Sequence, residues 1–219
     1  MDAIVPFSAD RPKSRLSTVL TPEERSSFAR AMLRDVLDAI TTAGGTPRVL
    51  ATGPVDDLTH RVVVDDRPLT TAVNGVLESG VAENAESDTP SDDSDPIAIV
   101  MADVALATPE AVGKLFDAGQ RADVVVAPGR GGGTNALVVD HPAFRVDYHG
   151  ASYVDHRRIA EDVGASVGVV DSHRLATDID EPADLAELLI HGDGAAARWL
   201  AEAGFTLETT DGRVGVVRE

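Results

Sequence analysis

The sequence contains no cysteine and only two lysines, Lys13 and Lys114, among its 219 residues. Without cysteine, neither disulfide bonds nor thiolate metal sites contribute to the fold or the chemistry. Every apolar run is too short for a membrane span, and residues 1–6 lack the pattern of a signal peptide. We therefore expect a cytoplasmic protein without a membrane partner.

Positive charge is scarce overall, because 19 Lys and Arg residues stand against 37 Asp and Glu, giving a formal net charge of -18. Nucleic acids and bilayer surfaces are also negative, so this balance argues against both as partners. A small anionic substrate remains compatible if local cations and a metal ion offset the field. An acid-rich, lysine-poor surface is typical of adaptation to high salt, where screening makes dense negative charge tolerable. We infer a halophilic cytoplasm.

The length fits one α/β domain better than two. We expect a single domain over residues 1–219, with a Rossmann-like, mostly parallel sheet flanked by helices. Residues 80–96 are predicted to be an acidic, mobile insertion, because their composition cannot bury enough apolar surface to order itself. Residues 191–219 are predicted to form a C-terminal extension with a small helix and a hairpin.

The apolar run at residues 97–101 is typical of a strand buried on both faces of a parallel sheet. Asp103 follows where this strand ends. Ligands of open α/β sheets bind outside the carboxyl ends of the strands, so Asp103 is suited to hold a metal ion or a substrate hydroxyl. Alternatively, Asp103 caps the next helix, although Thr108 and Pro109 already provide a start signal for it. We favour the functional role.

The first loop concentrates positive charge. A strand is expected at residues 3–5, ended by Pro6, and Arg11, Lys13 and Arg15 follow it. Three cations in five positions indicate a phosphate clamp, with Lys13 and Arg15 as the favoured pair. The loop lacks the glycine and Lys-Ser/Thr pattern of a P-loop. A solvated basic loop is an equally good alternative from the local sequence.

Other elements follow from caps and periodicity. A helix opens after Thr21 and stops at Gly44, and another ends near Leu77. Further strands are predicted at residues 48–52, 61–64, 123–128, 136–139 and 167–170.

A glycine-rich segment, residues 129–135, joins two of these strands. Its glycines would let backbone amides approach a ligand closely, and Thr134 and Asn135 would add side-chain hydrogen bonds. A flexible hairpin turn explains the glycines equally well.

Two polar patterns lie further on. Ser152 and His156 are four residues apart on one predicted helical face, but a pair such as His149 and His156 is more typical of a surface than of a ligand set. Asp178 and Asp180 alternate on an extended segment, so both could reach one cation. Capping of the following helix would explain Asp180 alone.

In order and spacing, these motifs resemble the nucleotidyltransferases of the glycosyltransferase-A type fold, and within them the 2-phospho-L-lactate guanylyltransferase family. The segments that carry the resemblance are residues 12–17, 102–103, 133–137, 150–156 and 177–185. Members of that family, known from archaea, transfer a guanylyl group from GTP to 2-phospho-L-lactate, or to phosphoenolpyruvate or 3-phosphoglycerate. This is a step in making the deazaflavin coenzyme called factor 420.

The resemblance implies a site, residue by residue. Mg²⁺ would be bound by Asp103, Asp178 and Asp180. Catalysis would involve Lys13, Arg15 and Asp103, and the nucleotide site would comprise Pro6, Lys13, Arg15 and Leu69. The phosphorylated acid would be held by Thr134, Asn135, His149, Gly150 and Ser152. Ser8 departs from the family, since many relatives carry a lysine there.

The implied chemistry is an in-line attack of an acceptor phosphate oxygen on the α-phosphorus of GTP, with pyrophosphate as leaving group. It requires positioning and charge neutralisation rather than a protein nucleophile. One alternative is a nucleotidyltransferase of the same fold with another acceptor, such as a molybdopterin or a sugar phosphate. A second is a nucleotide-binding regulatory protein without turnover, which the three acids disfavour because a pure binder needs no metal geometry. The sequence leaves a homodimer open.

Overall fold

The computed structural model describes residues 1–10, 12–83 and 96–218. The strands in these parts of the chain are β1 (Asp2–Phe7), β2 (Thr46–Ala51), β3 (Arg61–Val64), β4 (Ile97–Val100), β5 (Val124–Pro128), β6 (Thr134–Val139), β7 (Val167–Val169), β8 (Phe205–Thr210) and β9 (Arg213–Arg218). The α-helices are α1 (Pro22–Thr42), α2 (Leu69–Glu83), α3 (Pro109–Gly119), α4 (Ser152–Asp162), α5 (His173–Ala176), α6 (Asp184–His191) and α7 (Ala195–Glu202), and a 3-10 turn, η1, covers Ser14–Leu16.

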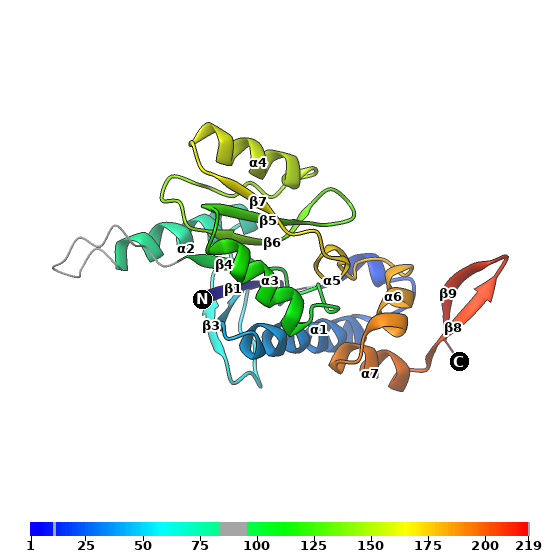
Figure 1. Ribbon diagram of the computed structural model, residues 1–219. Coiled ribbons are helices and arrows are strands. Elements are labelled where there is room, and N and C mark those ends of the chain that lie inside the picture. Colours follow the sequence, from blue (N-terminus) through cyan, green and yellow to red (C-terminus); the bar gives the residue numbers. More distant parts are fainter. Residues whose placement is uncertain (11, 84–95, 219) are drawn as a thin grey trace.

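Seven strands form one sheet in the order β3-β2-β1-β4-β6-β5-β7 (Figure 1). Strand β6 runs antiparallel to both neighbours, β4 and β5, while the other pairs are parallel. The predicted mostly parallel α/β sheet is confirmed. The reversal at β6 agrees with the hairpin turn that the sequence left open for residues 129–135, whereas its antiparallel pairing with β4 was not predicted.

Apolar side chains cover both faces of the sheet, as alternation along β1 illustrates. Ala3, Val5 and Phe7 belong to the core that includes α1 and α3, whereas Ile4 belongs to the core that includes α2 and α4. The sheet is therefore the middle of three layers, and the continuous apolar runs in the sequence reflect burial on both sides.

The helix starts agree with the predicted caps. The Thr21 side chain accepts a hydrogen bond from Glu24 N, and the Glu24 side chain accepts one from Thr21 N, which completes a capping box at α1. Thr108 accepts from Ala111 N at the start of α3. After α1, the chain turns at Gly44, whose φ of 86° favours glycine.

Two boundaries differ from the prediction. Pro6 does not end β1, because it still pairs with Leu50 of β2; only the pairing with β4 stops, at Ile4. The helix expected to end near Leu77 continues to Glu83, since an isolated glycine within a helix is tolerated. The rest of the predicted acidic insertion, residues 84–95, lies outside the described residues.

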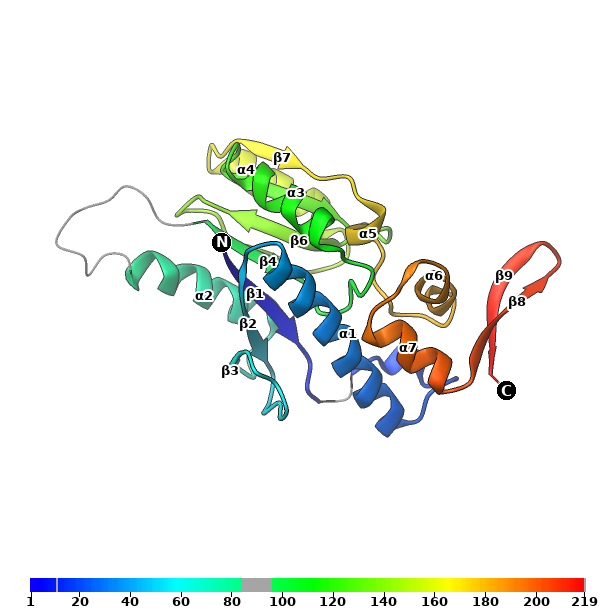
Figure 2. The ribbon, with the colours of Figure 1, turned by 60° about the horizontal axis from the view of Figure 1, so that its bottom comes forward.

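The C-terminal part carries the predicted small helix, α7, and the hairpin of β8 and β9. The hairpin projects from the end of the molecule beside α6 and α7 (Figures 1 and 2). None of the helices in the described ranges has both the length and the apolar character needed to cross a membrane.

Candidate functional site

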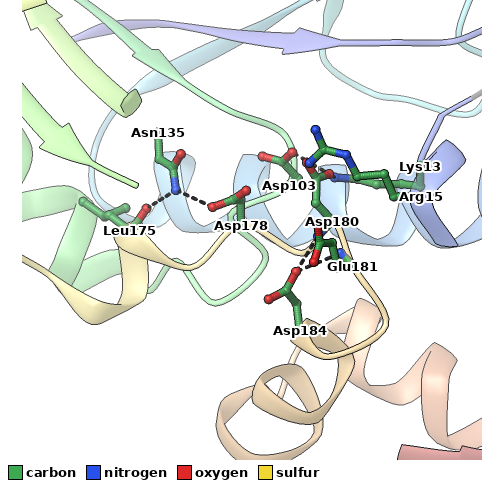
Figure 3. Close-up of polar contacts among 9 residues, drawn as sticks. All are labelled: Lys13, Arg15, Asp103, Asn135, Leu175, Asp178, Asp180, Glu181 and Asp184. Atoms are coloured by element: carbon green, nitrogen blue, oxygen red, sulfur yellow. Dashed lines mark hydrogen bonds and ion pairs between the residues drawn. The ribbon is translucent and has the colours of Figure 1, made fainter. Parts of the chain in front are cut away.

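Lys13 lies at the centre of a charge cluster beyond the carboxyl ends of β1 and β4 (Figure 3). We call it the lysine cluster, and it consists of Lys13, Arg15, Asp103 and Asp180. Its Nζ donates to Asp103 Oδ2 at 2.8 Å and to Asp180 Oδ1 at 2.6 Å. Arg15 Nη1 reaches the other oxygen, Asp180 Oδ2, at 3.3 Å. The Lys13 backbone is left-handed, with a φ of 54°, directly before η1. A non-glycine residue in this region stores strain, which is common at ligand-binding sites.

The Lys13 ammonium is largely shielded from solvent, with 10% of its side chain exposed, whereas Arg15 is 67% exposed. Burial by itself would lower the pKa of Lys13, but the carboxylates of Asp103 and Asp180 outweigh it, so the pKa lies above its usual value. Lys13 is therefore a fixed positive charge, and Arg15 is a second cation open to a ligand.

The segment that carries Asp180 is anchored on both sides. Ile179 is fully buried and donates its N–H to Asp103 O at 3.1 Å. Asp184 Oδ2 accepts from the N–H groups of Asp180 and Glu181, at 3.1 and 2.8 Å. Because α6 begins at Asp184, the suggestion that Asp180 caps a helix opening at Glu181 is wrong. The carboxylate of Asp180 instead binds the two cations.

Asp178 lies on the same segment but has a different partner. Asn135 Nδ2 donates to Asp178 Oδ1 at 3.2 Å and to Leu175 O at 3.0 Å (Figure 3). Gly129 makes room for this amide, since a Cβ there would lie 2.6 Å from Asn135 Oδ1. Asn135 thus positions the Asp178 carboxylate, and Gly129 permits that position.

Burial raises the pKa of Asp178, and the nearby negative charges of Asp103 and Asp180 add to the effect, while the bond from Asn135 opposes it. Asp178 therefore lies in a region, near Asp103 and Asp180, where its own negative charge is unfavourable without a cation. Such a region suits a cation held by oxygen ligands.

A cavity of about 220 Å³ opens beside this cluster. Lys13, Asp103 and Asp180 line it, together with Pro6 and Ser8. Pro6 therefore lies where the nucleotide was predicted to bind. Leu69, the other predicted nucleotide contact, is at the start of α2 and 39% exposed, and it is not among the described residues that line this cavity.

Thr134 pairs with His156 through its hydroxyl oxygen. Asp147 N donates to His156 Nε2 at 2.9 Å, so the imidazole proton resides on Nδ1, 2.9 Å from Thr134 Oγ1. His156 is fully buried, and burial lowers its pKa to about 4, against a smaller opposing effect of nearby carboxylates. The expectation that His149 and His156 form a surface pair is wrong for His156, which is a neutral core residue.

The other predicted acceptor residues lie around the start of α4. Ser152 is buried, with 4% of its surface exposed. His149 is exposed and its Nε2 lies 3.0 Å from Asp147 Oδ2. Gly150 has a φ of 35°, which allows the chain to turn there. The structure thus groups these residues apart from the lysine cluster, with which they share no direct contact among the described interactions.

The glycine-rich segment is a hairpin turn between β5 and β6. Gly129 N donates to Gly133 O at 2.9 Å, and Gly132 N donates to Gly129 O at 3.0 Å. Gly132 O also accepts from Tyr153 N at 3.2 Å, which joins the turn to α4. The backbone of residues 129–133 is therefore the hairpin turn that was the alternative interpretation of the glycines. This turn lies between the lysine cluster and the predicted acceptor residues at the start of α4.

Two polar residues on α2 were missed from the sequence. Asn74 Nδ2 donates to Val146 O at 3.0 Å, and Asn74 Oδ1 accepts from Val146 N at 2.8 Å. Thr70 Oγ1 accepts from Tyr148 N at 3.0 Å. These three bonds hold the loop before His149. A contact across more than 70 residues leaves no local signal in the sequence.

The complete chain, residues 1–219, matches the family model described as guanylyl transferase CofC-like. The chain is also 64% identical over 225 residues to the 2-phospho-L-lactate guanylyltransferase of Halorubrum lacusprofundi, with 100% of both chains covered. The chain belongs to the guanylyl transferase CofC-like family. The resemblance drawn from the motifs is confirmed.

Further comparisons agree with this placement. The CofC-like chain is 59% identical to the 2-phospho-L-lactate guanylyltransferase of Haloterrigena turkmenica, covering 100% of the chain and 97% of that relative. A Desulfovibrio desulfuricans structure described as a nucleotide-diphospho-sugar transferase superposes with a TM-score of 0.73, covers 92% of this chain and 94% of its own, and shares 15% identity. That likeness shows the fold. The CofC-like chain is therefore a transferase of the nucleotidyltransferase type.

Proposed function

We propose that this chain joins GTP to a phosphorylated three-carbon acid, 2-phospho-L-lactate or phosphoenolpyruvate, and releases pyrophosphate. The observation that carries the proposal is the Lys13 ammonium, held by Asp103 and Asp180 at a cavity outside the carboxyl ends of β1 and β4. Ligands of open α/β sheets bind at this edge. The family membership supports GTP as donor, because the curated relatives are named 2-phospho-L-lactate guanylyltransferase.

Each residue has a role in this proposal. Lys13, fixed by two carboxylates, offsets negative charge on the triphosphate. Arg15 is exposed and presents a planar guanidinium, which suits bidentate binding of a phosphate group. No protein nucleophile is needed, because an acceptor phosphate oxygen attacks the α-phosphorus directly.

The three carboxylates have the ligand chemistry of a magnesium site. Asp103, Asp178 and Asp180 provide oxygen ligands of the kind Mg²⁺ prefers, and the raised pKa of Asp178 supports a need for positive charge there. When bound, Mg²⁺ would neutralise charge on the phosphates and align them. In the side-chain arrangement described above, Lys13 provides the positive charge between Asp103 and Asp180.

The acceptor is proposed to lie between the lysine cluster and the start of α4. His149, Gly150 and Ser152 would contact its carboxylate or phosphate, while Thr134 and Asn135 hold the turn between the two groups. The proposal includes the halophilic cytoplasm, supported by the formal charge of -18, and a homodimer, which light scattering at high salt would test.

A substrate panel tests the proposal. Pyrophosphate release would be measured with each of the four ribonucleoside triphosphates against 2-phospho-L-lactate, phosphoenolpyruvate and 3-phosphoglycerate, at high KCl and with Mg²⁺. We expect release only when GTP and one of these acids are both present. Equal use of another nucleotide, or release that requires a sugar phosphate instead, would contradict the proposal.

A further inference from the structure

A second group of metal-ligating side chains lies on α5 and α6, apart from the lysine cluster. Within the described parts of the chain, one set of three or more such residues brings all its ligand atoms within 4.8 Å of one another: His173, Glu187 and His191. The three predicted magnesium ligands do not form such a set. Nothing in the proposed reaction uses these two histidines.

The distances within this group match a metal site better than a hydrogen-bonded cluster. Glu187 Oε2 lies 3.6 Å from His173 Nε2 and 3.7 Å from His191 Nε2. Both distances are longer than a hydrogen bond between these atoms would be. Ligand atoms at about 2.1 Å from a tetrahedral Zn²⁺ are separated by about 3.4 Å, close to these two distances. The ligand atoms of all three residues lie within 4.8 Å of one another, so they would have to move inward to surround one ion.

The group is also prearranged and accessible. Glu187 and His191 are four residues apart on α6 and therefore share one face. Arg174, the neighbour of His173, donates to His191 O and so holds α5 against the end of α6. The histidine side chains are 51% and 41% exposed, which leaves room for an ion to enter and for water to complete its coordination.

The ligand types select the class of ion. Imidazole nitrogen favours Zn²⁺, Co²⁺, Ni²⁺ or Cu²⁺, whereas Mg²⁺ favours oxygen ligands and keeps several waters. Two imidazoles and one carboxylate are a known zinc donor set. The group therefore differs in its chemistry from the carboxylates beside Lys13.

We propose that His173, Glu187 and His191 form a binding site for a divalent transition-metal ion, with Zn²⁺ as its representative, that clips α5 to α6. Residues 177–183 connect these helices and include Asp178 and Asp180. A bound ion would close this connection into a loop and restrict the opening of the segment that carries both acids. The site does not depend on guanylyl transfer, because zinc binding is measured without nucleotide.

The test is calorimetric titration of ZnCl₂ into untagged protein at high KCl, with saturating Mg²⁺ to occupy oxygen-only sites. We expect one equivalent to bind to the wild type and the thermal midpoint to rise with zinc concentration. His173→Gln, Glu187→Gln and His191→Gln should each weaken binding at least about tenfold and abolish the rise in midpoint. Their midpoints without zinc, compared with the wild type, verify folding.

Two histidine variants serve as controls. His60→Gln removes a histidine on the connection between β2 and β3, and His149→Gln removes one that also has carboxylate neighbours, at 3.0 and 3.8 Å. Both should bind zinc like the wild type. The proposal is overturned if the wild type binds no zinc, if the three ligand variants retain its affinity, or if His149→Gln alone loses binding.

Discussion

Asp178 is a single side chain whose charge opposes folding. Its pKa is raised, chiefly by burial, so the charged form is less favourable in the folded than in the unfolded state. Below a pH of about 3.9, Asp178 is protonated in both states and does not lower the free energy of unfolding. As pH rises through the folded pKa, its ionisation lowers the free energy of unfolding. Asp178→Asn should therefore unfold at a higher denaturant concentration than the wild type at pH 7 without metal, yet lose most of its activity.

The comparison requires guanidinium unfolding at pH 7 and at pH 3.5, together with pyrophosphate release at pH 7. The two proteins should converge in stability at the lower pH. If Asp178→Asn were less stable than the wild type at pH 7, the bond from Asn135 would outweigh the effect of burial.

His156 gives a second prediction, with the opposite direction of shift. Its pKa is lowered to about 4, so the stability that its neutral form provides is present above pH 6.5 and is lost as pH falls toward 4. The loss amounts to about 3 kcal/mol if the full shift is realised. His156→Gln should be less stable at pH 7, but its stability should change less between pH 6.5 and 4.

Denaturant unfolding of both proteins across that range, at constant high salt, measures the difference. Other carboxyl groups titrate in both proteins, so only the difference between the two curves is informative. Parallel curves would show that protonation of His156 does not limit acid stability.

At the level of elements, the turn between β5 and β6 controls the position of Asp178. In Gly129→Ala, the new Cβ would lie 2.6 Å from Asn135 Oδ1, so Asn135 must move and release Asp178. We expect activity to fall at least about tenfold, with a loss of about 1–3 kcal/mol in stability. Gly131→Ala is the matched control in the same turn, since its Cβ would meet no atom within 4 Å.

Steady-state kinetics and thermal unfolding of both variants test this account of the turn. Equal kinetics for Gly129→Ala and Gly131→Ala would mean that the Asn135 contact does not position the acid. A collapse of folding in Gly131→Ala would instead mean that the whole turn is intolerant of side chains.

Prediction from the sequence succeeded where the signal is local. Thr21 and Thr108 mark helix starts because capping depends on residues three positions apart. Prediction failed where contacts between segments distant in the sequence determine the structure. Nothing near Asp180 in the sequence shows that its carboxylate binds Lys13, 167 residues away. Likewise, nothing near His156 shows that Thr134 and Asp147 pair with its two ring nitrogens.

The family resemblance supplied what local patterns could not. Lys13, Asp103 and Asp180 were associated by their order along the chain, and the structure brings these three into direct contact. Their roles toward magnesium and GTP stay predictions. The antiparallel pairing of β6 with β4 and the continuation of β1 through Pro6 depend on pairing partners, which a single sequence does not specify.

At the scale of the whole molecule, the net charge of -18 predicts a dependence on salt. The Debye length grows from about 3 Å at 1 M to about 30 Å at 0.01 M, so self-repulsion should unfold the wild type at low KCl. Lys13→Ala should weaken the use of GTP at every KCl concentration at which the protein is folded. Its salt-unfolding midpoint should move to higher KCl, because Asp103 and Asp180 lose the shielded cation that they bind. The use of GTP is therefore compared at KCl concentrations at which both proteins are folded.

Circular dichroism and GTP-dependent pyrophosphate release over a KCl series compare the two proteins. If Lys13→Ala moved the salt-unfolding midpoint and left the turnover of GTP unchanged, Lys13 would be a structural counter-charge for Asp103 and Asp180. The phosphate clamp would then have to lie elsewhere.

The most direct test of guanylyl transfer at the lysine cluster follows each phosphate of GTP separately. Wild-type protein would be incubated with 2-phospho-L-lactate and GTP labelled at either the α or the γ phosphate, beside Asp103→Asn and, as control, Asp162→Asn at the exposed end of α4. The α label should appear in the acid product and the γ label in pyrophosphate for the wild type and Asp162→Asn. Asp103→Asn should be at least about a hundredfold slower while folded. Transfer of the γ label to the acid, or wild-type rates in Asp103→Asn, would contradict this account.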